Sequence, residues 1–250
     1  MTPFLAIVRV TARQLTGRSR LFGFGLLSLA PAALLMIAAR SADPSALDLE
    51  LGVLLVVPFF SLIIPITAVI LAGSALGDER RDKTLSFLVL RPISRLEIVA
   101  AKATAATLVS TGFALFGALA LSATWLALGG GLDIFPPIAF GATIACAMYS
   151  AVFVLLGNIL ARATLAGLLY VLLFESVIVD NFDRLAGASF WRIGLGATVD
   201  TMPSHFPSRA LLGPLGEWVP SLGSALIVAG TVAVIAVSLC TMLLSRRDAL

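Results

Sequence analysis

The stretch that decides the fold is LGSALIVAGTVAVIAVSLCTMLL, residues 222–244, which contains no charged side chain. A helix of this length, rising 1.5 Å per residue, is long enough to cross the hydrocarbon core of a bilayer. Five further apolar stretches precede it, at residues 21–39, 51–77, 103–128, 135–160 and 165–179. The fifth stretch is short and contains Glu175. The pattern predicts an all-α membrane protein with six transmembrane helices, forming a single domain over residues 1–250.

The composition of the whole chain supports a lipid environment. Of its 250 residues 59% are hydrophobic and 12% are charged, and the mean hydropathy is +1.04. Soluble domains have roughly half apolar and a quarter charged residues. The net charge of +3 could suggest nucleic acid, but the basic residues are scattered between apolar stretches, where they mark topology. We therefore expect contact with membrane lipid and none with nucleic acid.

The distribution of Lys and Arg predicts the orientation in the cell membrane. With the N-terminus in the cytoplasm, thirteen of the 17 basic residues fall on the inner side. The four on the outer side are Arg40, Arg184, Arg192 and Arg209. Because inner loops carry an excess of Lys and Arg, both termini are expected in the cytoplasm. The three tryptophans, Trp125, Trp191 and Trp218, fall at or beyond the predicted outer ends, where amphipathic rings prefer to lie.

Two segments outside the spans are predicted to be helical. In residues 1–20, Leu5, Val8, Ala12 and Leu15 recur at helical spacing, with arginines on another face. This pattern favours an interfacial helix next to anionic headgroups over a solvated basic tail. The outer segment, residues 180–220, is too long for a structureless loop in a compact domain. We expect short outer helices there, before the sixth span.

The second span carries residues with specific consequences for helix geometry. Pro58 and Pro65 each remove a backbone donor and should bend the helix. Gly73 and Gly77 are spaced so that a neighbouring helix can approach closely. The bend could serve gating or could be fixed, and the sequence leaves both open.

The cytoplasmic connector between spans two and three, residues 78–102, is the most highly charged part of the chain. Mixed charges are followed by an apolar run, residues 85–90, which is too short to cross a membrane, and then by Pro92. Ser94 and Glu97 have the spacing of a capping box, so a helix should start at Ser94 and continue into span three. The apolar run suits either a docking site for another protein or an interfacial anchor.

Residues 79–102, ERRDKTLSFLVLRPISRLEIVAAK, resemble the signature of the ABC-2 type permease family, the membrane subunits of ATP-binding-cassette exporters. Its members share an acidic residue, a Gly-Thr-Leu-like triplet, an apolar run, Pro-Val/Ile-Ser-Arg and a Lys entering span three. Here Lys83 stands where Gly is common. The six spans, the N-terminal helix and the outer segment fit the same family.

The resemblance implies that the connector contains a coupling helix, which docks on a cytoplasmic ABC ATPase subunit. The residues implied to contact the ATPase are Glu79, Arg80, Arg81, Lys83, Thr84, Leu85, Phe87 and Leu88. The residues implied to fix the turn and cap the next helix are Arg91, Pro92, Ser94, Arg95 and Glu97. Arg162 would belong to a smaller second contact. Glu175, the one acidic residue in an apolar span, is expected either in a vestibule facing a second copy or at the membrane surface.

No nucleotide-binding or catalytic motif accompanies these features. The chain has no Gly-x-x-x-x-Gly-Lys-[Ser/Thr] loop, one histidine and two cysteines. We therefore expect no catalytic residues, no metal site and no enzyme activity in this chain. The resemblance implies that ATP and Mg²⁺ bind in two copies of the partner ATPase, and that a second permease copy or a homologue completes the exporter. The alternative is a non-transporting anchor or assembly factor that recruits a soluble partner through residues 78–102.

Overall fold

The computed structural model describes residues 2–40, 56–81, 93–160, 162–178, 187–204, 215 and 219–247, and these contain helices and no strand. The long helices are α2 (Arg18–Ala38), α4 (Ile64–Arg81), α6 (Arg95–Ala127), α7 (Phe135–Ile159) and α12 (Leu222–Arg247). The shorter ones are α1 (Pro3–Leu15), α8 (Ala163–Leu169) and α10 (Phe190–Thr201). Two π-helical segments, η2 (Phe59–Ile63) and η4 (Tyr170–Ile178), and the 3₁₀ turn η3 (Leu132–Ile134) adjoin α4, α8 and α7.

Five helices in the described part of the chain are long and apolar enough to cross a membrane. They correspond to five of the six predicted spans and contain α2, α4, α6, α7 and α12. The remaining predicted span, residues 165–179, forms the helix α8–η4, whose apolar part Ala163–Glu175 is shorter than the other five. The all-helical membrane fold is thus confirmed, whereas six full spans are not.

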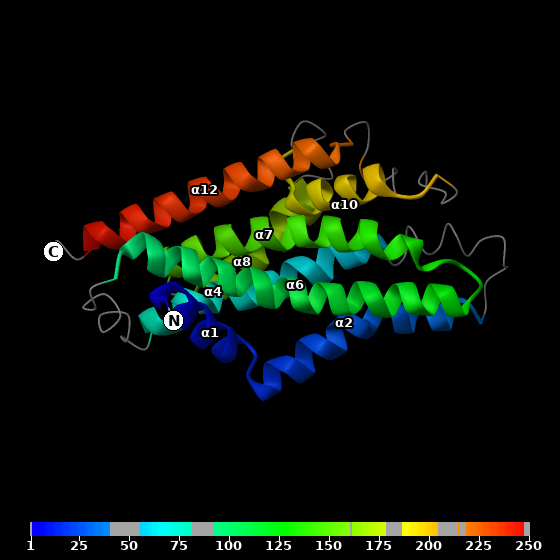
Figure 1. Ribbon diagram of the computed structural model, residues 1–250, viewed down its shortest axis with the longest axis horizontal. Coiled ribbons are helices and arrows are strands. Elements are labelled where there is room, and N and C mark those ends of the chain that lie inside the picture. The colour runs from blue at the N-terminus through cyan, green and yellow to red at the C-terminus, as the bar shows by residue number, and fades with distance from the viewer. Residues whose placement is uncertain are drawn as a thin grey trace.

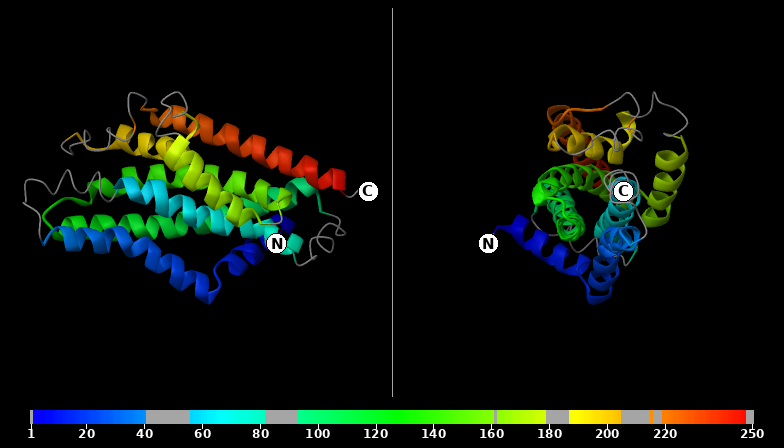
Figure 2. Two further views of the ribbon diagram at one scale, coloured as in Figure 1. Left: turned by 180° about the vertical axis from the view of Figure 1, so that it is seen from behind. Right: turned by 90° about the vertical axis from the view of Figure 1, so that its right-hand side faces the viewer.

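Helix α7 lies in the middle of the bundle and contacts α4, α6, α10 and α12. The long helices run side by side along the long axis of the molecule (Figure 1). The views in Figure 2 show α8–η4 on the outside of the bundle and α1 projecting from it. Both chain termini, the last turn of α4 and the first turn of α6 lie at one end (Figure 1). We call this the basic end, because Arg80, Arg81 and Arg95 lie there.

The N-terminal segment is divided into two helices where a single helix over residues 1–20 was expected. Helix α1 ends at Leu15, and Gly17, in an extended conformation, precedes α2. Thr11 and Leu15 are buried, whereas Leu5 is 52% exposed. Because α1 packs against α6, one face of it is covered, whereas Leu5 and Val10, which is 56% exposed, point outward. The break at Gly17 lets the chain turn into α2 (Figure 1).

The second span widens between its two prolines. Pro58 precedes the π-helical segment η2, and Pro65 follows it by two residues. The Ile64 N–H donates to the carbonyl of Phe59, five residues back, as a π-helix requires. Proline has no backbone N–H to donate, and a π turn is one way in which a helix accommodates such a residue.

Glycines allow the helices of the bundle to pack with their backbones close together. A Cβ atom on Gly157 of α7 would lie 2.8 Å from the Gly73 carbonyl oxygen and 3.3 Å from the Gly77 nitrogen. A Cβ on Gly194 of α10 would lie 2.8 Å from the Gly141 carbonyl oxygen of α7. The predicted close approach at Gly73 and Gly77 is therefore confirmed, and α7 is the helix that approaches.

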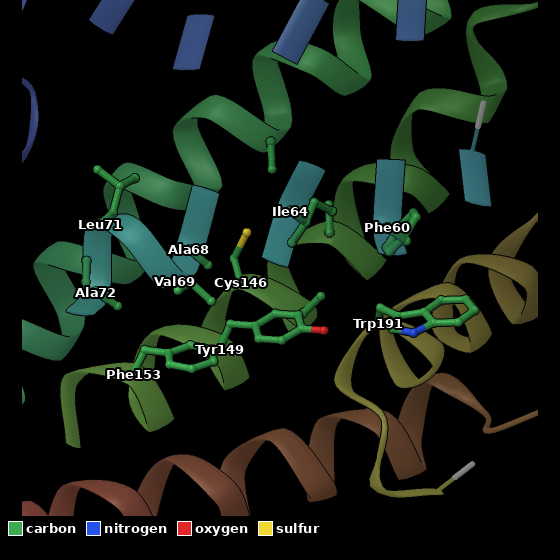
Figure 3. Close-up of a cluster of buried hydrophobic side chains, with 14 of the residues drawn as sticks. Phe60, Ile64, Ala68, Val69, Leu71, Ala72, Cys146, Tyr149, Phe153 and Trp191 are labelled. Carbon is green, nitrogen blue, oxygen red and sulfur yellow. The ribbon is translucent and has the colours of Figure 1, made fainter. Parts of the chain in front are cut away.

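An aromatic core lies between α4, α7 and α10. The rings of Tyr149 and Phe153 stack with their centroids 6.0 Å apart, and Phe190 meets Tyr149 edge-on at 5.3 Å. Trp191 is 5% exposed and belongs to the same buried cluster (Figure 3). The expectation that Trp191 sits at the membrane surface is therefore wrong, because α10 turns this ring inward. Helix α10 lies within the segment 180–220, for which short outer helices were predicted.

Candidate functional site

The start of α6 is fixed by a side-chain cap. Ser94 is the N-cap in extended conformation, and its hydroxyl oxygen accepts a hydrogen bond from the Glu97 N–H at 3.1 Å. The reciprocal bond, from the Ser94 N–H to the Glu97 carboxylate, is not formed between these two described residues. The predicted helix start at Ser94 is confirmed, and the helix runs without interruption to Ala127.

A buried ion pair joins the last turn of α4 to α6. The Lys102 ammonium donates to Oε1 of Glu79 at 2.7 Å and to the Ala75 carbonyl at 2.9 Å. The Lys102 side chain is 1% exposed and that of Glu79 is 20% exposed. A lysine this deeply buried requires such partners, because an unpaired ammonium would lose its hydration without compensation. The two helices that border the connector are therefore held together at its base.

A second polar contact joins α4 to the start of α2. The Arg20 guanidinium donates to Asp78 Oδ2 and to the Ser74 hydroxyl, both at 3.2 Å. The other oxygen of Asp78 accepts from Arg81 at 3.1 Å. These side chains are partly exposed, so each pair contributes little to stability by itself. Together they fix the position of α2 relative to the last turn of α4.

Arg80 connects α4 to α7 at the same level. Its guanidinium donates to the Asn158 carbonyl at 2.8 Å, in the last turn of α7. A cation at a helix C-terminus is favoured by the helix dipole and by the unpaired carbonyls there. The Asn158 side-chain amide in turn lies 3.5 Å from the Cys240 carbonyl of α12. The last turn of α4 is thus bonded directly to α2, α6 and α7, and through Asn158 to α12.

Glu175 lies in a different polar cluster, at the start of α10. Its carboxylate accepts from the Ser189 hydroxyl at 2.9 Å and from the Phe190 N–H at 3.4 Å. Ser189 is also the N-cap of α10 and accepts from the Arg192 N–H at 3.5 Å. Glu175 is 1% exposed in the single chain. Its carboxylate therefore joins η4 to α10, and the predicted vestibule role remains a prediction.

The comparison with known proteins identifies the family. The model of the family described as "ABC-2 family transporter protein" matches residues 17–180, well over half of the chain. The chain belongs to the ABC-2 family of transporter proteins. The match extends from the residue before α2 to just beyond η4. It includes the polar base of the connector, by which we mean Arg20, Asp78, Glu79, Arg80 and Lys102. None of the curated proteins compared with the chain matches it.

Membership of the ABC-2 family confirms the resemblance drawn from residues 79–102 and implies partnership with an ABC ATPase subunit. Of the predicted contact residues of this ABC-2 protein, Glu79, Arg80 and Arg81 are described, and each makes a contact within the chain. The other predicted connector residues, outside the described part, are Lys83, Thr84, Leu85, Phe87, Leu88, Arg91 and Pro92. Arg95 is partly buried in the first turn of α6.

Sequence reasoning missed the inward contacts of this ABC-2 chain. Lys102 was recognised only as part of the family signature, and Glu79 only as a residue of the docking surface. A signal for their pairing was nevertheless present, since a lysine in an apolar helix needs an acidic partner and Glu79 is close to the end of the preceding span. The contacts of Arg80 with α7 and of Glu175 with α10 carry no such signal.

Proposed function

We propose that this ABC-2 family protein is the permease subunit of an ABC exporter. Separate ATPase subunits, two copies, bind ATP and Mg²⁺, and the permease couples their hydrolysis to outward movement of a substrate across the cytoplasmic membrane. A second permease copy or a homologue completes the membrane part. The observation that carries the proposal is the family match over residues 17–180, which includes the connector and its polar base.

The contacts at the base of the connector support a coupling role for it. Within the connector, α4 ends at Arg81 and α6 begins at Arg95, and the Glu79–Lys102 pair joins these two helices. Arg80 and Asn158 extend the contacts to α7 and α12. A force on the connector would therefore move the ends of several spans together. ATP binding to a closed ATPase pair would then favour the permease conformation that fits the closed pair.

The arrangement of the basic end supports a cytoplasmic position for it. The last turn of α4, the first turn of α6 and both chain termini lie together there (Figure 1), with Arg80, Arg81 and Arg95 among them. Because inner segments carry an excess of Lys and Arg, these arginines support a cytoplasmic position for this end. The connector faces the compartment that contains ATP.

The test is affinity purification of the tagged chain from native membranes, followed by identification of the proteins that accompany it. We expect an ABC ATPase subunit in stoichiometric amount. Phe87→Asp should remove it, because a charge in the short apolar run 85–90 opposes docking. Leu132→Asp is the matched control, since it adds the same charge at an apolar residue that is 47% exposed, in η3. Recovery of the ATPase with Phe87→Asp would contradict the assigned contact.

Glu79→Arg is a poor probe of this contact. The substitution would place a second cation beside the buried ammonium of Lys102, so loss of the ATPase could follow from unfolding of the base of the connector. Absence of any ATPase from the wild-type preparation, under mild detergent, would overturn the exporter proposal and favour the anchor or assembly factor.

A further inference from the structure

A pocket of about 480 Å³ lies between α4 and α8 at the basic end. Its lining consists of Gly73, Gly77, Asp78, Arg81, Arg162, Ala163, Thr164 and Leu165. Gly73 and Gly77 contribute only backbone atoms, and this creates space next to Thr164. The pocket lies beside the connector base but belongs to a different pair of helices.

The charged side chains of the pocket leave it positive. Asp78 is the one acidic residue among the described residues that line it, and its two oxygens already accept hydrogen bonds from Arg20 and Arg81. Among the described residues around the pocket, three guanidinium groups, of Arg20, Arg81 and Arg162, thus lie near one carboxylate. Arg162 is exposed, and none of the hydrogen bonds between described residues uses its guanidinium. Two guanidinium groups at the rim, with the Thr164 hydroxyl between α8 and α4, suit an anion with several oxygen acceptors.

The helix beside the pocket continues as an apolar surface. Leu165, which lines the pocket, is 55% exposed, and Leu169 one turn later is 56% exposed. Leu172 and Leu173, in η4, are 52% and 55% exposed. This helix lies on the outside of the bundle (Figure 2). A ligand with a charged head in the pocket could therefore lay a hydrocarbon chain along the same helix.

We propose that this pocket binds the phosphate group of an anionic phospholipid from the leaflet at the basic end. Arg162 holds the phosphate oxygens, Thr164 donates a further hydrogen bond, and an acyl chain lies on the exposed leucines of α8 and η4. The guanidinium of Arg81, bonded to Asp78, adds positive charge beside them. Basic pockets between membrane helices on the cytoplasmic side bind anionic headgroups in this way. The apolar surface below the arginines is what favours a lipid over free phosphate. The proposal does not depend on the exporter function.

The experiment measures phospholipid bound to the purified full-length chain. The protein is delipidated in detergent, mixed with either phosphatidylglycerol or phosphatidylcholine, and its bound lipid is counted by native mass spectrometry. We expect one phosphatidylglycerol per chain to be retained over phosphatidylcholine. Arg162→Gln should weaken the binding about fivefold, the effect of removing one basic residue beside an anionic headgroup. Arg13→Gln is the control, because it removes the same charge from an exposed residue of α1.

Each outcome decides the proposal. Selective loss of phosphatidylglycerol in Arg162→Gln, with an unchanged melting temperature, supports it. Equal losses in Arg162→Gln and Arg13→Gln would overturn it, because general surface charge would then explain the binding. Displacement of the lipid by inorganic phosphate at equal concentration would show a site for free phosphate, and this also overturns it. Equal retention of phosphatidylcholine would also overturn it, because binding would then not depend on the charge of the headgroup.

Discussion

The ammonium of Lys102 lies 2.7 Å from Oε1 of Glu79, although 23 residues separate them in the sequence. Lys102 belongs to α6 and Glu79 to the last turn of α4, so the pair joins the two helices at the base of the connector. The pair is nearly excluded from water on the lysine side. Loss of this contact should therefore destabilise this end of the molecule more than loss of the other contacts described there.

Lys102→Met should destabilise the protein by about 3 kcal/mol, because it takes the Lys102 ammonium away from the Glu79 carboxylate in a mostly buried site. The expected readout is a lower melting temperature in detergent. The double variant Lys102→Met/Glu79→Gln removes both charges and should recover most of the loss. A double variant as unstable as the sum of the two single variants would show that the two residues do not interact.

Ser94→Ala should destabilise the start of α6 by about 1 kcal/mol, because the Glu97 N–H loses its acceptor. Hydrogen exchange of the first turn of α6 is the most direct measurement and should become faster. Ser94→Asp provides the control, since a carboxylate can also accept this bond and favours a helix N-terminus. Equal exchange in wild type and Ser94→Ala would mean that the cap contributes nothing.

Local signals predicted a large part of the fold. The starts of α7 at Phe135 and α12 at Leu222, the cap at Ser94 and the close approach at Gly73 and Gly77 follow from hydropathy, capping chemistry and residue size. These depend on neighbours along the chain. The π-helical segment η2 was not predicted, because proline indicates a distortion without saying which one.

Contacts between distant residues could not be predicted in the same way. Arg80 and Asn158 are 78 residues apart, and no periodicity or spacing marks them as partners. Trp191 was placed at the membrane surface from its position along the chain, whereas the packing of α10 on α7 turns it into the core. Side-chain direction in a short helix depends on what it packs against, and the sequence does not show this.

Gly157→Leu should destabilise the bundle by roughly 1–3 kcal/mol, because its Cβ alone would lie 2.8 Å from the Gly73 carbonyl oxygen and force α4 away from α7. Gly230→Leu in α12 is the matched control, since a Cβ there meets no atom within 4 Å. Melting temperatures of the two variants in the same detergent give the comparison. Equal melting temperatures would show that the close approach of α4 and α7 tolerates side chains.

Glu175→Leu should loosen α10, because the Ser189 hydroxyl and the Phe190 N–H both lose a buried carboxylate acceptor. Hydrogen bonds to a charged group are worth about 1.5–3 kcal/mol, so hydrogen exchange in residues 190–201 should rise markedly while that of α6 is unchanged. Glu175→Gln keeps one oxygen acceptor at this position and should lie between wild type and Glu175→Leu. Adding Ser189→Ala to Glu175→Leu should then cost less than Ser189→Ala alone, since the shared bond is already absent. If the two substitutions are additive instead, the carboxylate does not hold α10 through Ser189, and the burial of Glu175 must serve another part of the protein.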